Sequence, residues 1–110
     1  MGQRLGEFEL LVLLAALRLG PDEAYAVAVV DDIHERTGEV VRRANVYTAL
    51  KRLESRGLIT TRMGEPRAER GGKARRLISV HAAGIEAVRA STQTISAMAD
   101  GLEELLGDPA

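Results

Sequence analysis

The residues of this sequence whose types could do chemistry are mostly cationic and lie in one stretch. Between residues 42 and 76, eleven basic side chains stand against three acidic ones, a net charge of +8. The rest of the chain holds four basic and thirteen acidic side chains, so the formal total is only −1. Such segregation is typical of proteins that bind a polyanion, because each neutralised phosphate releases counterions. Thirteen of the fifteen basic residues are arginine, which suits phosphates and guanine edges, although a GC-rich genome is an alternative explanation for the excess of arginine.

The sequence shows no comparable pattern of residues for enzymatic catalysis or metal binding. The chain has no cysteine, which excludes disulfides, thiolate catalysis and cysteine-ligated zinc. Its two histidines, His34 and His81, are far apart in sequence, and surface or capping roles are expected for them rather than metal binding. No strained nucleophile turn, phosphate-cradling glycine loop or carboxylate pair in an apolar setting is present. We therefore expect no catalytic residue, no metal site and no cofactor, in a protein that is not an enzyme.

The composition predicts one water-soluble globular domain. The 110 residues are 45% hydrophobic and 28% charged, and only 3% are aromatic. The core must therefore be built from Leu, Val, Ile and Ala, a composition that favours helices. The apolar run at residues 10–17 is too short to span a membrane and too closely flanked by charge for a signal peptide. A buried helix, a cytoplasmic location and no membrane partner are the expectations.

Two helices are predicted before the basic stretch. The first covers residues 5–19 and ends at Gly20. The second is expected to be capped by Asp22 and stopped by a left-handed Gly38. Its predicted apolar stripe is Val27, Val30 and Ile33.

A third helix is predicted from Arg43 to a glycine stop at Gly57-Leu58, which makes a helix-turn-helix with the second. Its apolar face is Val46, Ala49, Leu50 and Leu53. The residues expected to contact DNA here are Arg42, Arg43, Asn45, Tyr47, Thr48, Lys51 and Arg52. Asn45 and Thr48 are the expected base readers, whereas Lys51 and Arg52 suit phosphates. A merely solvated face is the alternative, and Tyr47 could instead pack in the core or in a dimer.

After Gly57 the pattern changes to two short strands, at residues 58–63 and 76–80, on either side of a glycine-rich stretch. This pattern predicts a β wing. Its tip carries further cations expected to contact DNA, which are Arg67, Arg70, Lys73 and Arg75. These charges would repel one another without an anionic partner, although a solvated loop remains the alternative.

From Ala82 onward helical character returns. Apolar or small residues recur at alternating spacings of three and four, a heptad seam typical of a helix that faces a second chain. With two residues of the first helix, the predicted dimer interface comprises Leu5, Phe8, Ile85, Val88, Thr92, Ile95, Ala99, Leu102 and Leu106. Packing on the first helix of the same chain and a cavity between subunits stay open as alternatives. The predicted organisation is a DNA-binding domain at 1–81 and a dimerisation helix at 82–110, within one compact unit.

Nearly the whole chain resembles the PadR-type winged-helix regulators. The most specific match is the string Val46-Tyr47-Thr48-Ala49-Leu50-Lys51-Arg52-Leu53-Glu54, followed by Gly57-Leu58-Ile59. Tyr25 and the motifs Leu5-Gly6-Glu7-Phe8-Glu9, Gly64-Glu65-Pro66 and Arg70-Gly71-Gly72-Lys73 add to it. The chain departs from the family at Glu23-Ala24, where His-Gly is common, at Ala44, at Leu77-Ile78, where aromatics are usual, and at Val80-His81.

The resemblance implies a dimeric repressor of the compact subgroup with a short C-terminal helix. The expected fold class is α+β, mainly α: a winged helix-turn-helix with a two-stranded wing and a C-terminal dimerisation helix. The expected partners are a second copy and double-stranded DNA with a pseudo-palindromic operator. Some similar proteins bind flat hydrophobic ligands, so a small hydrophobic effector is also considered. The alternatives are a protein-interaction module for an acidic partner and a ligand sensor that binds DNA weakly.

Overall fold

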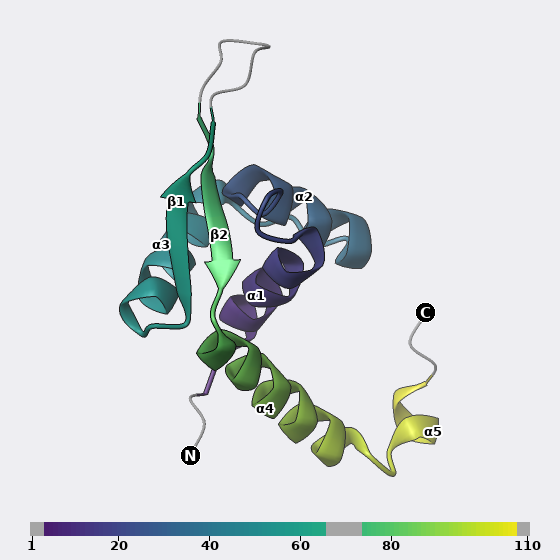
Figure 1. Cartoon of the computed structure of the whole chain (residues 1–110). Helices are drawn as coiled ribbons and strands as arrows, with labels where there is room; N and C mark the ends of the chain where they lie inside the picture. Colours follow the sequence, from purple (N-terminus) through teal and green to yellow (C-terminus); the bar gives the residue numbers. More distant parts are fainter. Residues whose placement is uncertain (1–3, 66–73, 108–110) are drawn as a thin grey trace.

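The computed structural model of the chain describes residues 4–65 and 74–107. Its elements are α1 (Glu7–Leu19), α2 (Ala26–Thr37), α3 (Arg43–Ser55), β1 (Ile59–Met63), β2 (Arg76–Val80), α4 (Ala82–Ala99) and α5 (Glu103–Leu106). Helices α1, α2 and α3 cluster beside the two-stranded sheet, and α4 leaves this body below the sheet (Figure 1). The predicted fold class, a mainly helical winged helix-turn-helix with a two-stranded wing, is confirmed.

The core lies where the first three helices and the start of the sheet meet. The predicted apolar face of α3 is buried at all four positions, and Val46 and Leu53 have no exposed surface. The other side chains with at most 1% exposure and the largest volumes are Val12, Leu13, Val29, Leu58, Ile59 and Ile78. Each such side chain contributes about 1.5–3 kcal/mol through its burial, so this aliphatic core fixes the orientation of α3.

The start and the face of α2 differ from the prediction. Asp22 is not the N-cap: α2 begins at Ala26 and Tyr25 precedes it in an extended conformation. Residues 21–23 form a turn because the N–H groups of Glu23 and Ala24 both donate to the carbonyl of Gly20. The buried face of α2 is Ala26, Val29 and Ile33, whereas Val27 is 37% exposed. The end of α2 is as predicted, with Gly38 in the left-handed region at φ 78°.

Helix α3 ends in the predicted glycine stop. Gly57 has φ 76°, its N–H donates to the carbonyl of Glu54, and the N–H of Leu58 donates to the carbonyl of Leu53. These two bonds define a Schellman motif, in which the apolar residue after the glycine turns back onto the helix. Leu58 is fully buried, so the chain enters β1 directly from the core.

The wing strands are antiparallel, with Ile59 opposite Val80 and Met63 opposite Arg76. The strands lie within the predicted ranges, except that the first begins at Ile59 rather than at Leu58. The backbone of β2 also bonds to the segment before α2, where the N–H of Ile78 donates to the carbonyl of Ala24 at 2.8 Å. The predicted wing-tip residues Arg67, Arg70 and Lys73 lie outside the described residues.

Helix α4 begins at Ala82 as predicted, but its buried residues, Gly84, Ala87 and Val88, all belong to its first half. The second half extends away from α1–α3 (Figure 1). The continuous heptad helix to Leu106 was wrong, because Gly101 adopts φ 88° and the chain turns before α5. Within the described residues, no helix combines the length and apolar character needed to cross a membrane.

Candidate nucleic-acid interface

The polar face of α3 is open to solvent along its whole length. All seven residues that the sequence assigned to DNA contact at this helix are exposed, while the opposite face is buried. They are Arg42, Arg43, Asn45, Tyr47, Thr48, Lys51 and Arg52. Tyr47 is 49% exposed, so core packing is excluded among the three roles considered for it. The structure thus gathers these seven side chains on α3 and on Arg42, the residue directly before it.

Four of these side chains carry positive charge that the described part of the chain does not neutralise. Arg42, Arg43, Lys51 and Arg52 form no ion pair with any described carboxylate, whereas other arginines of the chain do. Like charges on one exposed face repel one another, and an anionic partner relieves that repulsion. The exposed face of α3 is therefore a cationic surface without an internal counterion among the described residues.

Hydrogen bonds within α3 define what its polar side chains can offer. The hydroxyl of Thr48 donates to the carbonyl of Ala44 at 3.1 Å, so only acceptor capacity and the methyl group remain for a partner. Asn45 has an exposed amide that offers both donors and an acceptor. An amide of this kind can form a bidentate pair with adenine, which makes Asn45 the more versatile base reader of the two.

A cleft of about 390 Å³ lies between the start of α1 and the exposed face of α3. It is lined by Gly6, Phe8, Glu9, Asn45, Thr48, Ala49 and Arg52. Phe8, which the sequence assigned to a dimer interface, thus lies beside α3. The cleft continues the polar face of α3 onto the N-terminal end of α1.

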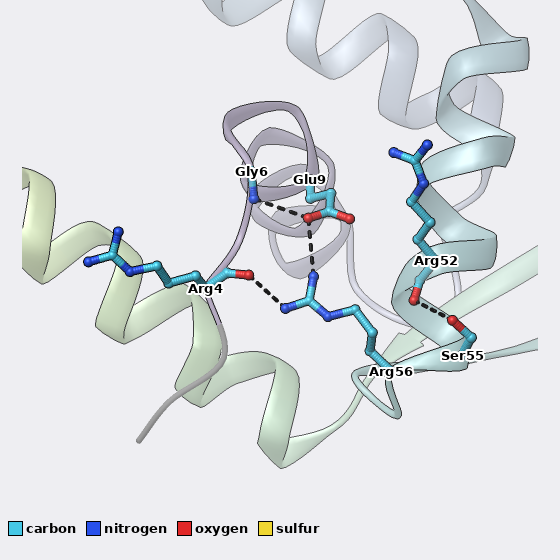
Figure 2. Close-up of polar contacts among 6 residues, drawn as sticks. All are labelled: Arg4, Gly6, Glu9, Arg52, Ser55 and Arg56. Atoms are coloured by element: carbon cyan, nitrogen blue, oxygen red, sulfur yellow. Dashed lines mark hydrogen bonds and ion pairs between the residues drawn. The ribbon is translucent and has the colours of Figure 1, made fainter.

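Two side chains at the C-terminal end of α3, Glu54 and Arg56, connect this helix to β1 and to the start of α1. Arg56, directly after α3, pairs with Glu9 of α1 at 3.2 Å and donates to the carbonyl of Arg4 at 2.6 Å (Figure 2). The carboxylate of Glu54 accepts from the N–H of Thr61 in β1 at 3.3 Å. Sequence reasoning assigned no role to Arg56, because its partners lie 47 and 52 positions away.

The base of the wing is held by acidic residues before α2. Arg62 of β1 pairs with Asp22 at 3.2 Å. Arg75 pairs with Glu23 at 3.5 Å, and its guanidinium lies over the ring of Tyr25. The side chain of Arg75 is only 21% exposed, in contrast to the free wing position expected from the sequence. The cause is this stacking, together with the backbone bond that brings β2 against residue 24.

The predicted dimer residues fall into three environments. Val88 is 7% exposed and belongs to the core of its own chain. Leu5 and Ile95 line a groove of about 500 Å³ between α1 and α4, together with Leu10, Leu11 and Ala90. Ile85, Leu102 and Leu106 are exposed, Thr92 donates to the carbonyl of Val88, and Ala99 is half-buried. Exposed apolar surface therefore extends from the groove toward α5, where Met98 and Leu105, not assigned from the sequence, enlarge it.

The two histidines belong to different elements of the fold. His34 is exposed on α2, and His81 precedes α4 with Nε2 at 3.1 Å from the hydroxyl of Thr60. Among residues 4–65 and 74–107, no group of three or more His, Asp or Glu side chains is placed to hold a metal ion.

The order of helices, the two-stranded wing and the cationic third helix define a winged helix-turn-helix protein. The chain belongs to the transcriptional regulator PadR-like family, whose model matches residues 13–90, and is therefore a transcription regulator. No curated protein matches the chain significantly in sequence.

Solved structures of the family share the fold. A PadR family transcriptional regulator from Eggerthella lenta is 25% identical, with a TM-score of 0.66 over 90% of this chain and 83% of that one. A PadR family regulator from Clostridium difficile is 20% identical, with a TM-score of 0.72 over 93% of this chain and 100% of that one. Bacillus subtilis PadR in complex with operator DNA is 19% identical, with a TM-score of 0.61 over 76% of this chain and 45% of that one.

Proposed function

We propose that the chain binds a pseudo-palindromic DNA operator as a homodimer, in the cytoplasm, and represses a neighbouring operon. The observation that carries the proposal is the exposed face of α3, whose four cations have no ion pair with a described carboxylate. In this proposal α3 enters the major groove, where Asn45 and Thr48 meet base edges while Lys51 and Arg52 meet phosphates. Arg42, Arg43 and Tyr47 add phosphate contacts.

The wing supplies the second part of the proposed interface. Arg67, Arg70 and Lys73 are assigned to the DNA backbone or the minor groove on the strength of their charge alone. Arg75 is assigned to a DNA phosphate as well, while its stacking on Tyr25 keeps the base of the wing in place. Support from a relative is the solved complex of Bacillus subtilis PadR with operator DNA, whose fold is similar.

A homodimer is proposed because α4 and α5 leave apolar side chains uncovered in the single chain. Ile95 is 65% exposed, Leu102 42% and Leu106 67%, and the described part of the chain holds no element that covers them. Twofold symmetry would present two copies of α3 about 34 Å apart, one turn of DNA. Repression would be steric, since a dimer seated on a promoter excludes polymerase.

A small hydrophobic effector is the remaining part of the proposal. The groove between α1 and α4 has a volume of about 500 Å³ and is lined largely by aliphatic side chains. Pockets of that size accept drug-sized molecules. Binding there would change how α4 meets a second copy and so loosen the spacing of the two α3 helices.

The decisive experiment selects fragments that the purified chain retains from a pool of random duplex DNA. The proposal expects an enriched motif with twofold symmetry, bound far more tightly than random duplex, with an affinity that falls steeply as salt rises. Enrichment of no motif would overturn it. Tight binding to an acidic protein partner without any preferred duplex would identify an interaction module instead.

A further inference from the structure

One guanidinium joins the end of α3 to the start of α1. Nη1 of Arg56 lies 3.2 Å from Oε1 of Glu9, and Nη2 donates to the carbonyl oxygen of Arg4 at 2.6 Å. In Figure 2 the side chain of Arg56 points from the end of α3 toward Glu9, whereas the side chain of Arg52 runs alongside α3 and has no marked contact with Glu9. Two atoms of one rigid, planar group are therefore fixed at two places on the N-terminal segment.

The carboxylate that receives Arg56 also begins α1. Oε1 of Glu9 accepts from the N–H of Gly6, the residue before the helix, at 3.0 Å. One oxygen thus bonds both the start of α1 and the end of α3. The side chains of Glu9 and Arg56 are only 15% and 28% exposed, so this pair is screened less by solvent than the pair of Arg62 and Asp22 in the wing.

The same segment borders both the groove between α1 and α4 and the cleft beside α3. Arg4, Leu5 and Glu7 line the groove between α1 and α4. Gly6, Phe8 and Glu9 line the cleft that faces Asn45, Thr48 and Arg52 on α3. Residues 4–9 therefore form a common wall, and Arg56 is the ion-paired link between that wall and α3.

We propose that Arg56 is a positioning residue for operator discrimination, an inference that rests on the proposed function. Base edges are read only when the side chains of the reading helix are held within a fraction of an ångström, whereas phosphate contacts tolerate larger shifts. Because Arg56 bonds to both Glu9 and Arg4, it sets the tilt of α3 against α1. It controls how well the chain distinguishes its operator from other duplexes.

The test uses the full chain with Arg56→Lys, which keeps the charge but cannot bridge both partners with a planar fork. We expect affinity for the selected operator to fall about tenfold, the scale of one charge-assisted hydrogen bond, while affinity for random duplex is unchanged. The matched control is Arg36→Lys, since Arg36 pairs with Asp32 on α2, away from this wall. That control leaves both affinities as in the wild type.

A second variant, Glu9→Gln, keeps the test decisive if Arg56→Lys folds poorly. Removing a negative charge would by itself tighten binding to operator and random duplex alike and so leave the ratio of the two affinities unchanged. The proposal expects this ratio to fall. A ratio unchanged in both folded variants overturns the inference and leaves the proposed function intact. A wild-type chain that prefers no duplex overturns both this inference and the proposed function. The wild type is therefore measured before any variant.

Discussion

The guanidinium carbon of Arg75 lies 4.7 Å from the centre of the Tyr25 ring, so an arginine at the base of the wing stacks on the residue directly before α2. Glu23 and Asp22 add one carboxylate each, to Arg75 and to Arg62. These carboxylates occupy arginines that DNA phosphates would otherwise attract. Both carboxylates are well exposed, at 63% and 90%, so each contact is weak and exchanges with solvent readily.

The double variant Asp22→Asn, Glu23→Gln should therefore bind DNA more tightly than the wild type. We expect affinity for operator and random duplex to rise together, by about threefold to tenfold, because two weak competitors of the phosphates are lost. Filter binding or fluorescence anisotropy at several salt concentrations measures this. Asp31→Asn serves as the control, since Asp31 is an exposed acid on α2 without an ion pair to a described residue. The single variants Asp22→Asn and Glu23→Gln each change the charge by as much as this control does. If all three gain the same affinity, the change in net charge alone is responsible.

Much of the fold could be predicted from the sequence because its signals are local. The faces of α3, the left-handed glycines Gly38 and Gly57, and the change from helical to alternating periodicity each depend on a few neighbouring residues. The start of α2 could not be predicted this way. Asp22 has the side chain of an N-cap, but the bonds of Glu23 and Ala24 to Gly20 and of Ile78 to Ala24 keep the chain out of a helix there.

For the candidate site too, features that depend on neighbouring residues could be predicted, whereas those that depend on distant residues could not. The exposed residues of α3 follow from helical periodicity, so the sequence predicted them correctly as one face. The roles of Arg56 and Arg75 depend on partners 47 and 52 residues away, respectively, which no local pattern indicates. The predicted heptad helix is wrong beyond residue 99. Gly101, which has a positive φ, interrupts a repeat that the spacing of apolar residues alone would continue.

Lys51→Ala and Arg52→Ala should separate DNA binding from stability. Both side chains are exposed and form no ion pair with a described residue, so unfolding free energy should change by no more than about 0.5 kcal/mol. Each variant should weaken binding to all duplexes, and the slope of log affinity against log salt should become shallower by about one. Urea unfolding and salt titrations measure the two effects. Leu53→Ala is the opposite control: this buried residue should cost about 2–5 kcal/mol of stability.

Gly84→Ala should destabilise the fold although alanine is the better helix former. A Cβ at this position would overlap the carbonyl oxygen of Leu58 and would lie 2.7 Å from a methyl group of Val80. Helix propensity alone would stabilise by about 1 kcal/mol, but forcing α4 away from the sheet should cost about 1–3 kcal/mol. Thermal unfolding at one protein concentration reveals which effect prevails. Ala97→Gly, at an exposed site on the same helix, calibrates the propensity, and a stabilised Gly84→Ala would contradict the close packing.

Ile95→Asp should convert the proposed dimer into a folded monomer. Ile95 is 65% exposed in the single chain and lies on the half of α4 that contributes no buried residue. A carboxylate there costs the single chain little, whereas burying it without a partner between two subunits costs several kcal/mol. Sedimentation at micromolar concentration should therefore give half the wild-type mass, with far-UV circular dichroism unchanged.

The same variant should lose operator binding through geometry, because one copy of α3 reads only half of a symmetric site. Affinity for the full operator should approach that for an isolated half-site, which the wild type also binds weakly. Gln93→Asp, an exposed substitution two positions away on a different face of α4, should stay dimeric and bind the operator normally. An Ile95→Asp chain that remains dimeric would show that other surfaces join the subunits. One that is monomeric yet binds the full operator as tightly as the wild type would mean that recognition does not require paired α3 helices.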